Sequence, residues 1–134
     1  TPLNLTSNNA NIVFASTLDA GNSSYANKRS LTINAGSGEV TFNGMVGTQH
    51  ALYYDFVNRS SDLNLYRLIV NAGTLNLNAD VTTFETQTYN SRVLVGDNGS
   101  NGLTRILLSE DPAVIFNGTV DDSVARKPWP VWWS

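Results

Sequence analysis

Apolar and polar residues alternate with a period of two along much of this chain, in short runs separated by turns. Residues 31–33 (Leu-Thr-Ile), 75–77 (Leu-Asn-Leu) and 106–108 (Ile-Leu-Leu) are such runs. Clusters of Asn, Gly, Ser and Asp, which favour turns, lie between them. No stretch keeps a period of 3.6 residues, as an amphipathic helix would. The pattern predicts an all-β protein with many short strands.

A seven-residue pattern occurs four times, at residues 12–18, 40–46, 75–81 and 114–120. Each copy has apolar residues at its first, third and seventh positions and a small residue at its fourth or fifth. A short apolar run precedes each copy, beginning at Leu3, Leu31, Leu68 and Ile106. Such self-similarity indicates a unit that buries its apolar face against its neighbours.

The repeat favours a parallel β-helix, or β-solenoid, of about five to seven short coils. A β-sandwich or jelly roll is the alternative, because short apolar runs occur in any β protein. We expect the solenoid to span residues 1–125 and a Trp- and Pro-rich tail to span residues 126–134.

Equivalent positions of the four copies should lie above one another. We therefore expect Phe42, Leu77 and Phe116 to form one buried stack, because they hold the third position of their copies, as Phe14 does in the first copy. Gly44 and Gly118 follow Asn after an apolar run and should mark corners where neighbouring coils approach closely. The corners should also carry a ladder of side-chain amides along the axis. The residues expected in this ladder are Asn34, Asn43, Asn71 and Asn117.

Four segments (31–47, 68–83, 87–90 and 114–121) resemble repeats of filamentous-haemagglutinin-like adhesins. These are large bacterial surface proteins, many exported by two-partner secretion, whose shafts are right-handed parallel β-helices. The resemblance covers roughly residues 10–122 and implies a right-handed helix located outside the cell or at its surface. It implies no catalytic residue. The chain departs from the family in the aromatic stretch 52–57 and at its C-terminal tryptophans.

Composition and charge argue against several classes of binding partner and bonding. The formal net charge is −3 and the sequence pI is about 4.8, so a nucleic-acid surface is not expected. No apolar run is long enough for a membrane span, so we expect no membrane insertion. Cysteine is absent, which excludes disulfides and cysteine-ligated metals.

Candidate catalytic and metal-binding residues are few. His50 is the only histidine, and no serine has the sequence context of a nucleophile. Most of the eleven acidic residues fall at predicted corners, without a readable pair. Residues 97–102 resemble the start of a calcium loop, but Leu108 stands where the bidentate Glu would be. The sequence therefore predicts no enzyme activity, no metal site and no cofactor.

Aromatic residues are the remaining candidates for interaction. All three tryptophans fall in the tail beside Pro128 and Pro130, and so much apolar area should either cap the end of the stack or bind a neighbouring molecule. Tyrosines near the predicted coils could form a platform for stacking sugars. The candidates are Trp129, Trp132, Trp133, Tyr53, Tyr54 and Tyr66.

Three functions remain open from the sequence. The first is a non-enzymatic structural and adhesive part of a bacterial surface fibre. The second is a self-assembling filament subunit joined through its C-terminal Trp tail. The third is a carbohydrate-binding or carbohydrate-cleaving β-helix. The expected partners are neighbouring repeats or other copies of the chain, or a host-surface protein or glycan.

Overall fold

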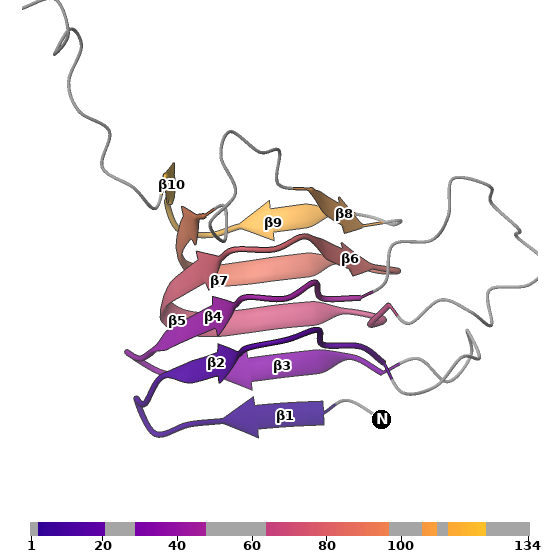
Figure 1. The fold of residues 1–134 in the computed structure, drawn as a ribbon. Helices are drawn as coiled ribbons and strands as arrows, with labels where there is room; N and C mark the ends of the chain where they lie inside the picture. Colours follow the sequence, from indigo (N-terminus) through magenta and orange to yellow (C-terminus); the bar gives the residue numbers. More distant parts are fainter. Residues whose placement is uncertain (1–2, 21–28, 48–63, 97–105, 110–112, 123–134) are drawn as a thin grey trace, which may run out of the picture.

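The computed structural model describes residues 3–20, 29–47, 64–96, 106–109 and 113–122. Within these ranges the chain is all-β, with ten strands and no helix (Figure 1). Every pair of strands formed by these residues is parallel, unlike the antiparallel pairs of a sandwich or jelly roll. The strands are β1 (Leu3–Thr6), β2 (Ile12–Phe14), β3 (Leu31–Asn34), β4 (Glu39–Phe42), β5 (Leu68–Leu77), β6 (Val81–Thr83), β7 (Gln87–Val95), β8 (Leu107–Ser109), β9 (Val114–Phe116) and β10 (Val120–Asp122).

The strands are stacked in rows along one direction, with β1 at one end and β9 at the other (Figure 1). Row A consists of β1, β3, the first half of β5, the first half of β7 and β9, paired in that order. Row B consists of β2, β4, the second half of β5, the second half of β7 and β10. The long strands β5 and β7 run through both rows, and their register shifts between Asn71 and Thr74.

A third row contributes described residues to every level except that of β9 and β10. Row C contains β6 and β8, which pair with each other. Single parallel bridges extend row C from Val81 to Val46 and from Val46 to Leu18. The chain therefore passes through row A, row B and row C in turn and then returns to row A one level further along.

The first three copies of the seven-residue pattern are in register, as the sequence predicts. Their first positions, Ile12, Val40 and Leu75, pair with one another in row B. Their third positions are likewise aligned in row B, and their seventh positions are the bridged residues of row C. The seven-residue pattern therefore covers the segment in which the chain leaves row B and enters row C.

The fourth copy is a correction to the sequence analysis. Residues 114–116 lie in row A, where Val114 pairs with Gln87 and Phe116 pairs with Tyr89. Phe116 therefore does not stack on Phe42 and Leu77, and 40% of its surface is exposed. The preceding apolar run was also misplaced, because β8 belongs to row C. An apolar–polar–apolar run fits any inward-facing strand, so the pattern alone does not distinguish the rows.

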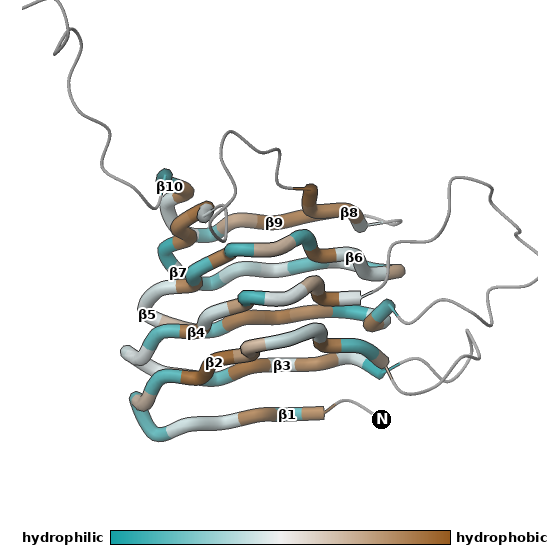
Figure 2. The backbone as a smooth tube through the Cα atoms, in the orientation of Figure 1, coloured by the Kyte–Doolittle hydropathy of each residue, from teal (hydrophilic) through white to brown (hydrophobic). Residues whose placement is uncertain are grey.

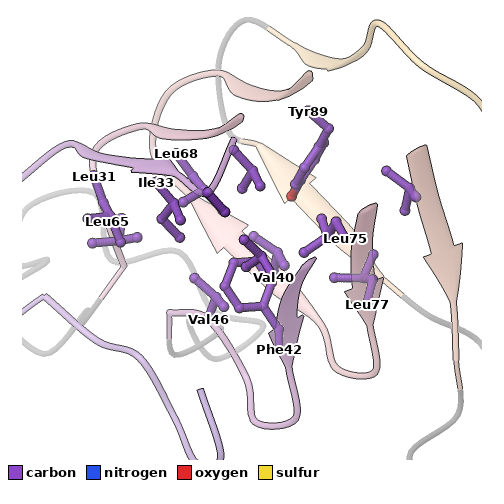
Figure 3. Packing of buried hydrophobic residues seen from close by; sticks show 14 of the residues in the cluster. Leu31, Ile33, Val40, Phe42, Val46, Leu65, Leu68, Leu75, Leu77 and Tyr89 are labelled. Atoms are coloured by element: carbon purple, nitrogen blue, oxygen red, sulfur yellow. The ribbon is translucent and has the colours of Figure 1, made fainter. Parts of the chain in front are cut away.

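The core lies between the rows and is filled by inward-facing side chains of successive levels. Phe42 and Leu77 are fully buried and in register, and the ring of Phe14 lies 5.4 Å from that of Phe42. Figure 3 shows Phe42 and Leu77 beside the neighbouring column of Val40 and Leu75. The residues of the second column in row B are Phe14, Phe42, Leu77, Val95 and Asp122. This column is apolar except at its last position.

Glycines allow close approach between levels at two different corners. A Cβ at Gly44 would lie 2.3 Å from the carbonyl carbon of Ser16, and one at Gly118 would lie 2.2 Å from the carbonyl oxygen of Ser91. Neither glycine has a positive φ among the described residues. The reason for glycine is therefore the neighbouring backbone. Gly44 follows row B whereas Gly118 follows row A, so the two corners are not equivalent.

Candidate functional site

Most of the aromatic residues suggested as an interaction site lie outside the described residues. These are Trp129, Trp132, Trp133, Tyr53 and Tyr54. Tyr66 is described, and its hydroxyl donates a hydrogen bond to Glu85 Oε1 at 2.8 Å. The guanidinium of Arg67 lies 5.2 Å from the centroid of its ring. Tyr66 is thus engaged by groups of its own chain.

A continuous ladder of asparagine side chains runs along the outer surface of row A. Asn71 Nδ2 donates to Asn34 Oδ1 at 2.8 Å, and Asn90 Nδ2 donates to Asn71 Oδ1 at 2.7 Å. Asn117 Nδ2 then donates to Asn90 Oδ1 at 2.6 Å. All donors point the same way along the stack. The ladder links four successive levels and fixes their register from the outside.

Three of these four residues were predicted from the sequence, and Asn90 was not. Asn43 was also predicted to lie in this ladder, which is wrong. Asn43 Oδ1 accepts a separate bond from Asn78 Nδ2 at 2.9 Å, after row B. The signal for Asn90 is present in the sequence, because Asn follows the inward–outward–inward triplet in four of the five strands of row A, whereas Thr6 follows it in β1. These four segments are residues 31–34, 68–71, 87–90 and 114–117.

A polar network lies inside the core at the level of β7. Gln87 occupies the column of Leu31 and Leu68 and is fully buried. Its Nε2 donates to the carbonyl oxygens of Val81 at 3.2 Å and Leu108 at 2.9 Å, and its Oε1 accepts the Tyr89 hydroxyl at 2.6 Å. The network therefore ties row A to both strands of row C.

Burial raises the pKa of the Tyr89 hydroxyl above its ordinary value, because the surrounding core desolvates the phenolate. The hydroxyl is thus held protonated as a donor to Gln87. Nothing in this network opens to solvent, since both side chains are fully buried. The network therefore stabilises the fold and is not arranged for proton transfer to or from solvent.

The two ends of the stack expose positions that are buried elsewhere. At the β1 end, Leu3 is 60% exposed although Leu31 in the same column is buried. At the β9 end, Phe116 is exposed on one side and stacks on Tyr89 at 5.3 Å on the other. Val120 of β10 is also exposed, at 47%. Figure 2 shows apolar segments in the strands at both ends. These ends are the candidate interaction site.

The β9 end carries two adjacent acidic residues. Asp121 lies beside Arg92 of β7, with 3.5 Å between Arg92 Nε and Asp121 Oδ2. Asp122 pairs in register with Val95, at the end of the second column in row B. Both side chains of the Arg92–Asp121 salt bridge are exposed, so the salt bridge contributes little to stability.

The remaining candidates of the sequence analysis give no catalytic or metal site among the described residues. His50 and residues 97–102 lie outside the described ranges. Where the structure is described, no three His, Cys, Asp or Glu side chains gather in a group that could hold a metal ion. The described residues also include no helix of the length and hydropathy needed to cross a membrane.

Comparisons with protein-family models, with curated proteins and with solved structures found no match to this chain. The arguments about function therefore rest on the residues and on the geometry of the stack.

Proposed function

We propose that this chain is a right-handed parallel β-helix of about five to seven short coils that serves as a non-enzymatic part of a bacterial surface fibre or adhesin. Right-handedness follows the general rule for parallel strands joined by crossovers. The resemblance of residues 31–47 and 68–83 to filamentous-haemagglutinin-like repeats supports the cell-surface location.

One observation carries the proposal: a series of polar side chains on the stack bonds from one level to the next. The asparagine ladder of row A is the main case. In addition, Asn9 Oδ1 and Asn11 Oδ1 accept the backbone N–H groups of Ser37 and Glu39 at 3.0 and 2.9 Å. Bonds along the stack resist its separation into levels, which is what a load-carrying shaft requires. A catalytic site would instead gather polar groups around a cavity.

Surface labelling of the producing bacterium would test the proposal. Antibodies raised against the purified chain should label intact cells as strongly as permeabilised ones. Antibodies against a cytosolic protein, used as the control, should label permeabilised cells alone. If antibodies against the chain also required permeabilisation, the proposed surface location would be wrong.

The absence of enzyme activity is a separate part of the proposal and needs its own measurement. The purified chain should release no reducing ends and no unsaturated products from acidic or neutral polysaccharides. Turnover that disappears when one pair of acidic residues is replaced by amides would refute the non-enzymatic role and favour a carbohydrate-cleaving β-helix.

A further inference from the structure

The tripeptide Phe-Asn-Gly occurs twice in the chain, at residues 42–44 and 116–118, and the structure describes both copies. Asparagine followed by glycine is especially prone to deamidation, because a residue without Cβ lets its backbone nitrogen approach the amide of the preceding side chain. The two copies have the same immediate neighbours, so the local sequence does not favour one over the other. A difference between Asn43 and Asn117 must therefore come from their places in the stack.

Asn43 is bonded to the levels on both sides of it. Its backbone N–H donates to the carbonyl oxygen of Phe14 at 2.9 Å, and its side-chain Oδ1 accepts a bond from Asn78 Nδ2 at 2.9 Å. Asn43 and Gly44 are both half-buried. The side chain of Asn43 can turn toward the nitrogen of Gly44 only after its bond to the next level has opened. Such openings are rare in the middle of a stack.

Asn117 is held through a bond that its own amide nitrogen donates. Asn117 Nδ2 donates to Asn90 Oδ1 at 2.6 Å, and its backbone N–H donates to the carbonyl oxygen of Tyr89 at 3.0 Å, so both bonds go to the level of β7. Asn117 and Gly118 are exposed to solvent. Rotation of this side chain toward Gly118 breaks one surface hydrogen bond, which costs little because water replaces the lost partner.

We propose that Asn117 is a site of spontaneous deamidation, whereas the stack protects the same tripeptide at Asn43. The backbone nitrogen of Gly118 gives up its proton and forms a bond to Cγ of Asn117, and the bond from Cγ to Nδ2 breaks. Nδ2 takes up a proton and leaves as ammonia, and a succinimide ring remains in the main chain. Water then opens the ring at either carbonyl, which gives aspartate or isoaspartate. This chemistry is independent of the proposed adhesive role.

Deamidation at Asn117 removes a donor from the asparagine ladder. Both products carry an oxygen in place of Nδ2, and this oxygen cannot donate to Asn90 Oδ1, which is itself an acceptor. Isoaspartate also adds one carbon to the main chain. β9 and β10 pair with β7 at the same offset, so residues 117–119 match residues 90–92 one for one. A longer main chain disturbs this match, so isoaspartate is the more disruptive product.

Peptide mapping by mass spectrometry, after incubation of the whole folded chain in mildly alkaline buffer, measures both sites in one sample. Aspartate and isoaspartate should form roughly tenfold faster at Asn117 than at Asn43, which is the factor that one further hydrogen bond to be opened supplies. In urea the two sites should react at similar rates. A tryptic digest places the other Asn-Gly pairs, at Asn98 and Asn101, in a separate peptide (residues 93–105).

Three outcomes would overturn the proposal. The first is an equal rate at Asn117 and Asn43 in the folded chain, and the second is a faster reaction at Asn43. The third is an unmodified Asn117 in the folded chain after a time in which the chain in urea has reacted.

Matched acidic variants test the consequence for the ladder. Asn117→Asp removes the donor of the bond to Asn90, so the midpoint of urea denaturation should fall below that of the wild type. Asn34→Asp makes the same change of charge, but Asn34 accepts its bond from Asn71, and a carboxylate still accepts it. The midpoint of Asn34→Asp should therefore be unchanged or higher. An equal fall in both variants, or no fall in Asn117→Asp, would overturn the proposed loss of the ladder bond.

Discussion

Phe42 is the residue at which packing between levels contributes most clearly to stability. It is fully buried between Phe14 and Leu77 of the adjoining levels. Phe42→Ala would remove this side chain and leave a cavity that neighbouring levels cannot close without breaking their register. We expect the free energy of unfolding to fall by about 3–5 kcal/mol, measured by urea denaturation.

Phe116 provides the matched control for this substitution. It is also a phenylalanine at an inward position, but 40% of its surface is exposed, and among the described strands β9 pairs with β7 alone. Phe116→Ala should therefore cost clearly less than Phe42→Ala, on the order of 1–2 kcal/mol. Equal losses at the two positions would mean that Phe116 has a second covering layer in solution.

Tyr89 gives the stack a dependence on alkaline pH. Its folded-state pKa is raised by burial, so the folded protein retains the hydroxyl proton at a pH where the unfolded chain releases it. Its contribution to stability is therefore complete below the ordinary tyrosine pKa of about 10. Above that pH the free energy of unfolding should decrease by about 1.4 kcal/mol per pH unit through this group.

Comparison with Tyr89→Phe isolates this titration from that of other groups. The variant lacks the hydroxyl that Gln87 Oε1 accepts, so it should be less stable at neutral pH. Its stability should nevertheless fall less steeply above pH 10 than that of the wild type. Parallel curves for the two proteins, measured by urea denaturation at several pH values, would contradict this account of Tyr89.

At the scale of elements, the asparagine ladder joins strands that are far apart in the sequence. Asn71 lies inside the ladder and makes two side-chain bonds, whereas Asn34 lies at its end and makes one. We expect Asn71→Ala to lower the free energy of unfolding by about 1–3 kcal/mol and Asn34→Ala by about half as much. Chemical denaturation of the two variants would measure both values.

A double-mutant cycle tests whether the ladder acts as a unit. Asn71 and Asn90 are bonded to each other, so the two Ala substitutions together should cost less than the sum of the single ones. Asn71 paired with Asn78, which bonds to Asn43 elsewhere, should give additive losses. Additive losses for both pairs would mean that the bond between Asn71 and Asn90 contributes no measurable coupling free energy.

The sequence allowed the strands and the first three repeats to be predicted because burial imposes a strict period of two on each strand. Val40 and Leu75 could thus be aligned before any coordinate was known. The prediction failed at residues 114–116, where the same apolar alternation occurs in row A. Residues 96–106 separate β7 from β8, and this longer spacing concealed that Val93 and Val95 continue the pattern of row B.

The candidate site was less predictable from the sequence, for two physical reasons. Gln87 does not look like a core residue, because its burial depends on acceptors in row C that lie far away in the sequence. Asp122 looks like an ordinary surface acid, and its inward position is visible only from its pairing with Val95. Such properties arise from register between levels, which local sequence patterns do not encode.

At the scale of the whole molecule, stability should decrease from the middle of the stack toward its ends. β5 is paired on both sides in both rows, whereas every residue of β1 and of β10 is exposed. In a linear stack each level is stabilised mainly by its immediate neighbours, so the end levels can open without the middle ones.

Native-state hydrogen exchange should reveal this gradient. In dilute protein the amides of β5 should exchange most slowly and those of β1 and β10 fastest. One uniform exchange rate for all strands would contradict the gradient.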